Sequence, residues 1–196
     1  MTYGTLPPVG YPASSKWLHW LVAILVLTAV TIGILLPYTQ PGPFQDGLFN
    51  AHKAFGVLIL ILMIVRIINR LAIGAPAAEP GLARWQHAAS SAVHGLLYVL
   101  LIVQPIIGYW ANSAYGASVN FFGLFNIPPI VETNQPLSEQ LFAIHRVLGL
   151  SIAALAALHI GAALQHFIWL CRLLLCRRSA CRFFGKEGGR ALGSTS

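Results

Sequence analysis

Charge is what this sequence has least of. Asp, Glu, Lys and Arg make up 9% of its 196 residues, whereas a typical soluble domain carries about 25%. Hydrophobic residues make up 57%, so the chain has too few polar side chains to cover a surface that faces water. This composition excludes a soluble enzyme and a disordered chain, and three cysteines are too few for a disulfide-built secreted domain. The length fits one domain.

Long apolar runs are abundant instead. A bilayer core of about 30 Å needs roughly 20 mostly apolar residues in a helix. Four stretches meet that need, and they cover 17–37, 53–73, 88–110 and 141–171. Backbone polar groups must be satisfied inside lipid, so each run is expected to be helical. The sequence therefore predicts an all-α integral membrane four-helix bundle.

The basic residues predict the orientation of this bundle. Four spans place both termini, and the loop between the second and third spans, on one side of the membrane. That side collects ten of the twelve Lys and Arg residues: Lys16, Arg66, Arg70, Arg84, Arg172, Arg177, Arg178, Arg182, Lys186 and Arg190. The other side keeps only Lys53 and Arg146. Because cytoplasmic loops carry the excess of positive charge, both termini are expected to be cytoplasmic.

The longest outer connection covers residues 111–140. Its middle reads VNFFGLFNIPPIV, which is apolar but interrupted by Gly123, Pro128 and Pro129. This segment is too short and too broken to span a bilayer. We expect it to lie on the outer membrane surface.

Seven histidines are many for so apolar a chain. An ionisable residue within a span is a functional candidate because burying it is costly, although any one His could equally serve as an interhelical hydrogen-bonding residue. His145 and His159 are 14 residues apart, on nearly one face of the fourth span and about 21 Å apart along it. His52 begins the second span at the outer surface and His19 begins the first at the inner surface. Two matched pairs at two depths are what two bis-histidine haems require.

Small and basic residues accompany these histidines. Gly56 and Gly149 each follow an outer His by one helical turn, where a flat macrocycle would need a missing side chain. Lys53 and Arg146 directly follow the same two histidines, and haem propionates favour such cations. Two further basic residues, Arg66 and Arg70, are candidates for the inner propionates. Positive-inside anchoring explains these two arginines equally well.

Several strings together resemble bacterial cytochrome b561: LHW at 18–20, HKAFG at 52–56, HGLLY at 94–98 with Pro105 and Gly108, HRVLG at 145–149, and ALH at 157–159. That family consists of four-helix, two-haem cytochromes of the bacterial inner membrane, related to the cytochrome b subunits of formate dehydrogenase and nickel–iron hydrogenase. The resemblance implies that the inner haem b is held by His19 and His159 and the outer one by His52 and His145. It also implies electron exchange with ubiquinone or a similar quinone, and in some members with superoxide at the outer face.

On this interpretation the chain has three parts. Residues 1–15 form a cytoplasmic segment, residues 16–171 the cytochrome b domain, and residues 172–196 a basic cytoplasmic tail. His94 and His166 are candidates for hydrogen bonding a quinone, with packing or interfacial roles at least as well supported. His166 is disfavoured as a haem ligand because it would place the fourth-span ligands about 31 Å apart. His87 has no assigned role.

The cysteines of the tail give no metal signal. Cys171, Cys176 and Cys181 are spaced five residues apart, a poor spacing for zinc, and no CxxCH string indicates covalent haem attachment. Free thiols are the favoured interpretation, with palmitoylation as an alternative.

Three functions are compatible with the pattern. The first is a self-contained electron-transfer cytochrome whose partners are lipid, a quinone and a small anion such as superoxide, with no nucleic acid and no required protein partner. The second is a membrane-anchor subunit that relays electrons between a dehydrogenase or hydrogenase and the quinone pool. The third, a metal transporter, is disfavoured because no Asp or Glu lies well inside a span.

Overall fold

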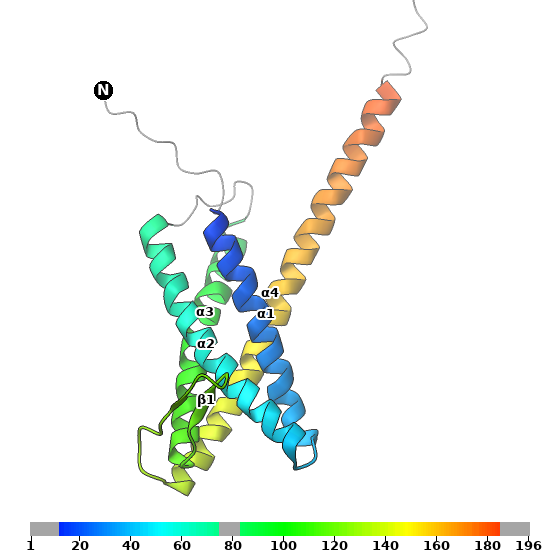
Figure 1. The fold of residues 1–196 in the computed structure, drawn as a ribbon. Helices are drawn as coiled ribbons and strands as arrows, with labels where there is room; N and C mark the ends of the chain where they lie inside the picture. Colours follow the sequence, from blue (N-terminus) through cyan, green and yellow to red (C-terminus); the bar gives the residue numbers. More distant parts are fainter. Residues whose placement is uncertain (1–11, 75–82, 185–196) are drawn as a thin grey trace, which may run out of the picture. The chain divides into compact units, whose positions relative to one another are not determined.

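A computed structural model describes residues 12–74 and 83–184 of the chain. The chain divides into two units, Met1–Leu155 and Ala156–Ser196, and each unit is described by itself. The ribbon of Figure 1 shows that most of the described chain is drawn as long helices. Lys186 and Arg190, which the sequence assigns to the basic tail, lie outside the described residues.

Four long helices account for most of the described chain. They are α1 (Ala13–Leu35), α2 (Pro43–Ile73), α3 (Arg84–Ala114) and α4 (Gln135–Phe184), with a single 3-10 turn η1 (Leu36–Tyr38) after the first. Each helix is long and apolar enough to cross a membrane. The predicted helical membrane protein with four spans is therefore confirmed.

Two helices begin well before the spans predicted from the sequence. Helix α2 starts at Pro43, after Gly42 with φ of 149°, and α4 starts at Gln135, where the side chain of Asn134 accepts a bond from Leu137 N–H (3.1 Å). Proline and asparagine favour such helix starts. The sequence predicts that His52 begins the second span. In the structure His52 lies nine residues after the start of its helix. The hydropathy of the sequence did not reveal the first turns of α2 and α4, because these turns contain polar residues.

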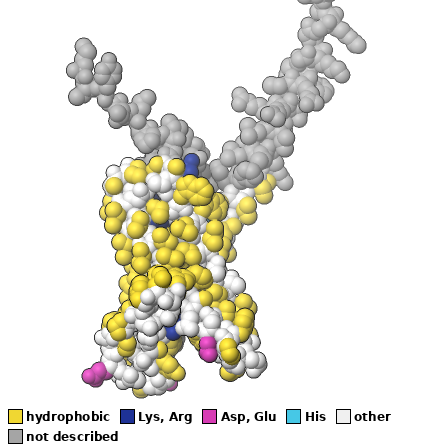
Figure 2. All heavy atoms as spheres, in the orientation of Figure 1, with side chains coloured by type: hydrophobic (Ala, Val, Ile, Leu, Met, Phe, Trp, Pro, Cys, Tyr) yellow, Lys and Arg dark blue, Asp and Glu magenta, His cyan; other side chains and the backbone are white. Residues whose placement is uncertain are grey.

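The core of the first unit is formed where α1, α2 and α4 meet. Its buried members are Val22, Val26, Ala29, Ile59, Met63 and Ile152. Most other large apolar side chains point outwards, and Figure 2 shows hydrophobic atoms over much of the described surface. Only lipid can cover such a surface without a large free-energy cost.

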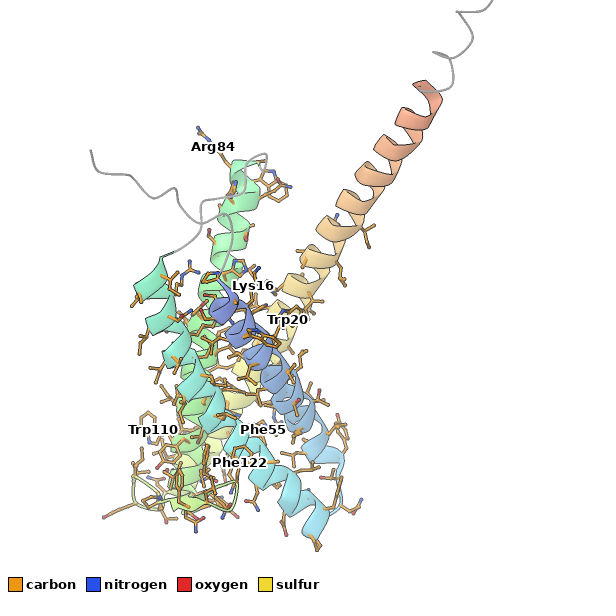
Figure 3. All side chains as sticks on the ribbon, turned by 45° about the horizontal axis from the view of Figure 1, so that its top comes forward. Lys16, Trp20, Phe55, Arg84, Trp110 and Phe122 are labelled. Carbon is orange, nitrogen blue, oxygen red and sulfur yellow. The ribbon has the colours of Figure 1, made fainter. Side chains whose placement is uncertain are left out.

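The outer connection contains a feature that the all-α prediction lacks. Strands β1 (Val119–Phe121) and β2 (Phe125–Ile127) form an antiparallel hairpin in which Asn120 pairs with Asn126. Its turn has positive φ at Phe122 (51°) and Gly123 (78°), the conformation of a tight hairpin turn. The Phe122 ring packs on Phe55 of α2 with 5.7 Å between centroids, and Figure 3 shows the two rings side by side.

The end of α3 anchors both the hairpin and the start of α4. Residues 111–114 are buried, and the Asn112 amide donates to Ala117 O (2.6 Å). The Ser138 hydroxyl donates to Ala111 O (3.0 Å), and Asn134 N–H donates to Ala114 O (2.8 Å). These bonds fix the register of α4 against α3, and thereby the height of His145.

Candidate functional site

Two imidazole rings meet between α2 and α4. The ring centroids of His52 and His145 are 6.0 Å apart and their planes are inclined by 82°. A metal–imidazole bond is about 2 Å long. Two such bonds in line, with each nitrogen lying slightly in front of its ring centre, place the centroids about 6 Å apart. The observed separation matches the distance that two imidazoles bound to one iron would have.

Hydrogen bonds orient both rings for metal binding. Nδ1 of His52 lies 3.0 Å from Ala29 O, and Nδ1 of His145 lies 3.2 Å from Gln104 O. A carbonyl oxygen can only accept, so Nδ1 carries the proton in each ring. The lone pair of each neutral ring is therefore on Nε2, the atom that binds metal when Nδ1–H is held by a carbonyl.

A glycine lies beside each of these rings. A Cβ at Gly33 would stand 3.1 Å from Cε1 of His52, and a Cβ at Gly108 would stand 2.7 Å from Cε1 of His145. Each glycine lies one turn after the residue whose carbonyl holds the ring, Ala29 or Gln104. The absence of a side chain at Gly33 and Gly108 lets each imidazole approach the neighbouring helix closely enough to bond.

The two glycines singled out from the sequence have different surroundings. A Cβ at Gly56 would meet no heavy atom of the described chain within 4 Å. A Cβ at Gly149 would lie 3.1 Å from the amide nitrogen of Gln104. The protein thus leaves Gly56 open to a group beside His52, whereas the space at Gly149 is used by a neighbouring side chain.

The two outer cations differ in their surroundings. The half-buried Lys53 donates to Ser118 O at 3.3 Å, at the approach to the hairpin. Arg146 is exposed on α4. Each residue places a basic side chain directly after one histidine of the pair in the sequence.

The inner end of the first unit holds a second cluster. The Arg66 guanidinium donates from Nε to the Tyr98 hydroxyl (3.0 Å) and from Nη1 to Nδ1 of His19 (3.0 Å). It also lies over the Tyr98 ring at 5.3 Å, and Arg70 lies over the same ring at 6.0 Å. Arginine has no acceptor, so Nδ1 of His19 accepts and the proton of a neutral His19 sits on Nε2. This is the reverse of the outer pair, and it does not fit an iron bond at Nε2.

The remaining predicted residues are placed as follows. His94 is exposed on α3, with Nδ1 3.4 Å from the Ser90 hydroxyl, and His87 lies near the start of the same helix. His159 belongs to the second unit, and so does His166, whose side chain lies outside what the structure describes. The side chains of the three cysteines also lie outside it.

Sequence reasoning missed the residues that support the histidines. Gln104, Gly33 and the Ala29 carbonyl belong to helices other than those of the rings they contact. Spacing along one helix shows which residues share its face but not what the facing helix places there. A small or polar residue one turn before a glycine, as in Ala29 to Gly33 and Gln104 to Gly108, was the available signal.

Four helices long and apolar enough to cross a membrane, with two imidazoles 6.0 Å apart between α2 and α4, fit the class of helical membrane cytochromes. Comparison with known proteins agrees: the family model of the prokaryotic cytochrome b561 matches residues 10–175. The chain belongs to the prokaryotic cytochrome b561 family. Membership makes it a multi-pass bacterial membrane protein that binds haem b and transfers electrons.

Individual relatives are moderately similar. Cytochrome b561 homolog 2 of Escherichia coli (strain K12) is 28% identical over 166 residues, which is 83% of this chain and 87% of the relative. Cytochrome b561 homolog 1 of the same organism is 28% identical over 151 residues, 76% and 85% of the two chains. The probable superoxide oxidase CybB of Yersinia pestis is 32% identical over 149 residues, 76% and 84% of the two chains.

Proposed function

We propose that this chain is a di-haem cytochrome of the bacterial inner membrane that carries electrons between its outer face and ubiquinone or a related quinone. Both termini face the cytoplasm in this proposal. The observation that carries it is the His52–His145 pair, whose separation and bonded Nδ1 atoms fit two axial ligands of one iron. When bound there, haem b supplies one-electron chemistry without forming or breaking covalent bonds in the protein.

The protein would supply the outer haem with ligands, a partly buried site and nearby positive charge. His52 and His145 would provide neutral nitrogen ligands, and both side chains are partly buried. Lys53 and Arg146 place positive charge beside the pair, where it attracts an anion and offers partners for propionates. We infer superoxide as the outer substrate from this chemistry, and the name of the Yersinia relative supports it. In the balanced reaction, two superoxide anions lose one electron each, and one quinone takes up two electrons and two protons.

The inner haem is proposed on His19 and His159, with His94 and His166 as candidates for hydrogen bonding the quinone. Iron binding at Nε2 of His19 requires the Arg66 guanidinium to release Nδ1. The guanidinium released in this way, like that of Arg70, would be available to pair with a propionate of the inner haem. Arg66 would therefore bond His19 when the haem is absent and a haem propionate when it is bound, which is the role expected for Arg66 from the sequence.

Replacing Arg66 with Gln is expected to lower the midpoint potential of the inner haem. Reduction adds negative charge, which a nearby guanidinium stabilises, so its removal favours the oxidised form. One charge at several ångströms in a partly buried site contributes about 1.4 kcal/mol, or roughly 60 mV for one electron. Anaerobic redox titration checks this, with Arg84→Gln as the control. An unchanged inner potential would refute the role of Arg66.

The function itself is tested on the purified protein. We expect two haems per chain by pyridine haemochrome assay and reduction of both by a quinol under anaerobic conditions. A haem-free protein that folds normally would refute the proposal. A stoichiometric iron–sulfur or metalloenzyme partner recovered from native membranes would instead support the anchor-subunit function. In the part of the chain that the structure describes, no three His, Cys, Asp or Glu side chains group to hold a metal ion, so the transporter alternative gains no support.

A further inference from the structure

Gln104 contacts His145 at two points. Its backbone oxygen accepts from the Nδ1–H of the imidazole (3.2 Å), and its side-chain Nε2 donates to the backbone oxygen of the same residue (2.9 Å). The second bond also identifies the two ends of the amide, because only the nitrogen can donate to a carbonyl. One residue of α3 therefore holds both the ring and the backbone of an iron-ligand candidate on α4.

Gly149 makes the second contact feasible. It lies one turn after His145, and its missing Cβ would stand 3.1 Å from Nε2 of Gln104. A methyl group at that position would push the amide away from the His145 carbonyl. The glycine one turn after His52, Gly56, faces no heavy atom of the described chain within 4 Å. The two glycines share a sequence offset but not an environment.

The amide of Gln104 is only half satisfied. Its Oε1 is buried and finds no hydrogen-bond partner among the described residues. A buried acceptor without a partner lowers stability, so an apolar side chain of similar volume would be at least as good for folding alone. Packing and stability therefore do not account for a glutamine here, whereas holding His145 does.

We propose that Gln104 is a positioning residue for the His145 ligand, and that Gly149 serves to admit its amide rather than the haem. Together, Gln104, Gly149 and the His145 carbonyl form a clasp between α3 and α4. The clasp fixes both the height of His145 and the direction of its ring, and with them the direction in which Nε2 presents its lone pair. This inference rests on the proposed haem at His52 and His145.

The test compares Gln104→Leu, Gly149→Ala, the double variant and the control Gly47→Ala in the purified holoprotein; Gly47 is an exposed helical glycine of α2 whose Cβ would meet no heavy atom of the described chain within 4 Å. Leucine lacks any atom at the Nε2 position and removes the unpaired Oε1. We expect each clasp variant to lose the outer haem to excess apomyoglobin about tenfold faster, as is typical when a bond that supports a metal ligand is removed. The low-spin ferric EPR signal of that haem should shift, because it reports ring orientation, while thermal stability is unchanged. The double variant should be no worse than either single variant, and Gly47→Ala should keep the wild-type EPR signal.

Two results would overturn the clasp. One is a Gln104→Leu protein whose outer haem has the retention and EPR signal of the wild type. The other is a haem loss in Gly149→Ala that adds to the loss in Gln104→Leu, because that pattern belongs to a glycine that packs on the haem directly. A wild-type protein with no outer haem would be a different failure, since it refutes the proposed function as well.

Discussion

Replacing His145 with Ala is expected to reduce the haem content from two per chain to one. The His52 ring would then face no second nitrogen ligand, and a b-type haem held by one imidazole in a water-poor site is readily lost or becomes high-spin. His52→Ala should have the same effect, because the two rings lie 6.0 Å apart as one ligand pair. Haemochrome assay and the low-spin EPR signals measure the loss.

The matched control for this prediction is His94→Ala. His94 is exposed on α3, and its substitution should leave both haems in place. If His145→Ala and His52→Ala removed different haems, or if either kept two low-spin haems, the outer pair would not be an axial ligand pair.

Gly108→Ala is expected to be the most damaging change that adds a single methyl group near the site. The new Cβ would stand 2.7 Å from Cε1 and 2.9 Å from Nδ1 of His145, closer than Cβ atoms in proteins approach other heavy atoms. The His145 ring cannot move away without losing a hydrogen bond, because its Nδ1 is bonded to the backbone oxygen of Gln104, which lies on α3 with Gly108. Overpacking of this kind costs about 1–3 kcal/mol, and we expect outer-haem affinity to fall roughly 10- to 100-fold.

A graded series checks the steric reason. Gly33→Ala, with its Cβ 3.1 Å from Cε1 of His52, should show a smaller loss, and Gly47→Ala, whose Cβ would meet no heavy atom of the described chain within 4 Å, should show little. Haem titration of the apoprotein in detergent gives the three affinities. Equal losses across the series, or none at Gly108, would contradict the close packing of the rings on the neighbouring helices.

The fold could largely be predicted from hydropathy. Four apolar runs are hard to mistake, and the structure places a long helix over each. The helix starts at Pro43 and Gln135 were missed because those turns are polar, although Gly42–Pro43 and Asn134 are typical helix-start residues. The hairpin was missed because its turn depends on a positive φ at Phe122, and a phenylalanine in the sequence does not indicate a positive φ.

The site could be predicted only in part. His52 and His145 were identified as candidates because burying an ionisable side chain in an apolar span is costly. The structure brings their rings together. Their supports could not be located, because Gln104, Gly33 and Gly108 act across helices and their partners depend on the register of packing. Arg66 was predicted to contact a propionate of the inner haem, but its bond to His19 depends on side-chain geometry that spacing does not contain.

The most direct test of the account is a superoxide pulse applied to the fully oxidised purified protein with ubiquinone present, followed by stopped-flow spectroscopy. We expect transient reduction of b-type haem, followed by its reoxidation as quinol forms. One quinol should form for every two superoxide anions consumed. We also expect that His145→Ala abolishes the transient. Haems that stay oxidised in the wild type, or a transient that survives in His145→Ala, would contradict the claim that the His52–His145 pair carries electrons from the outer face to quinone.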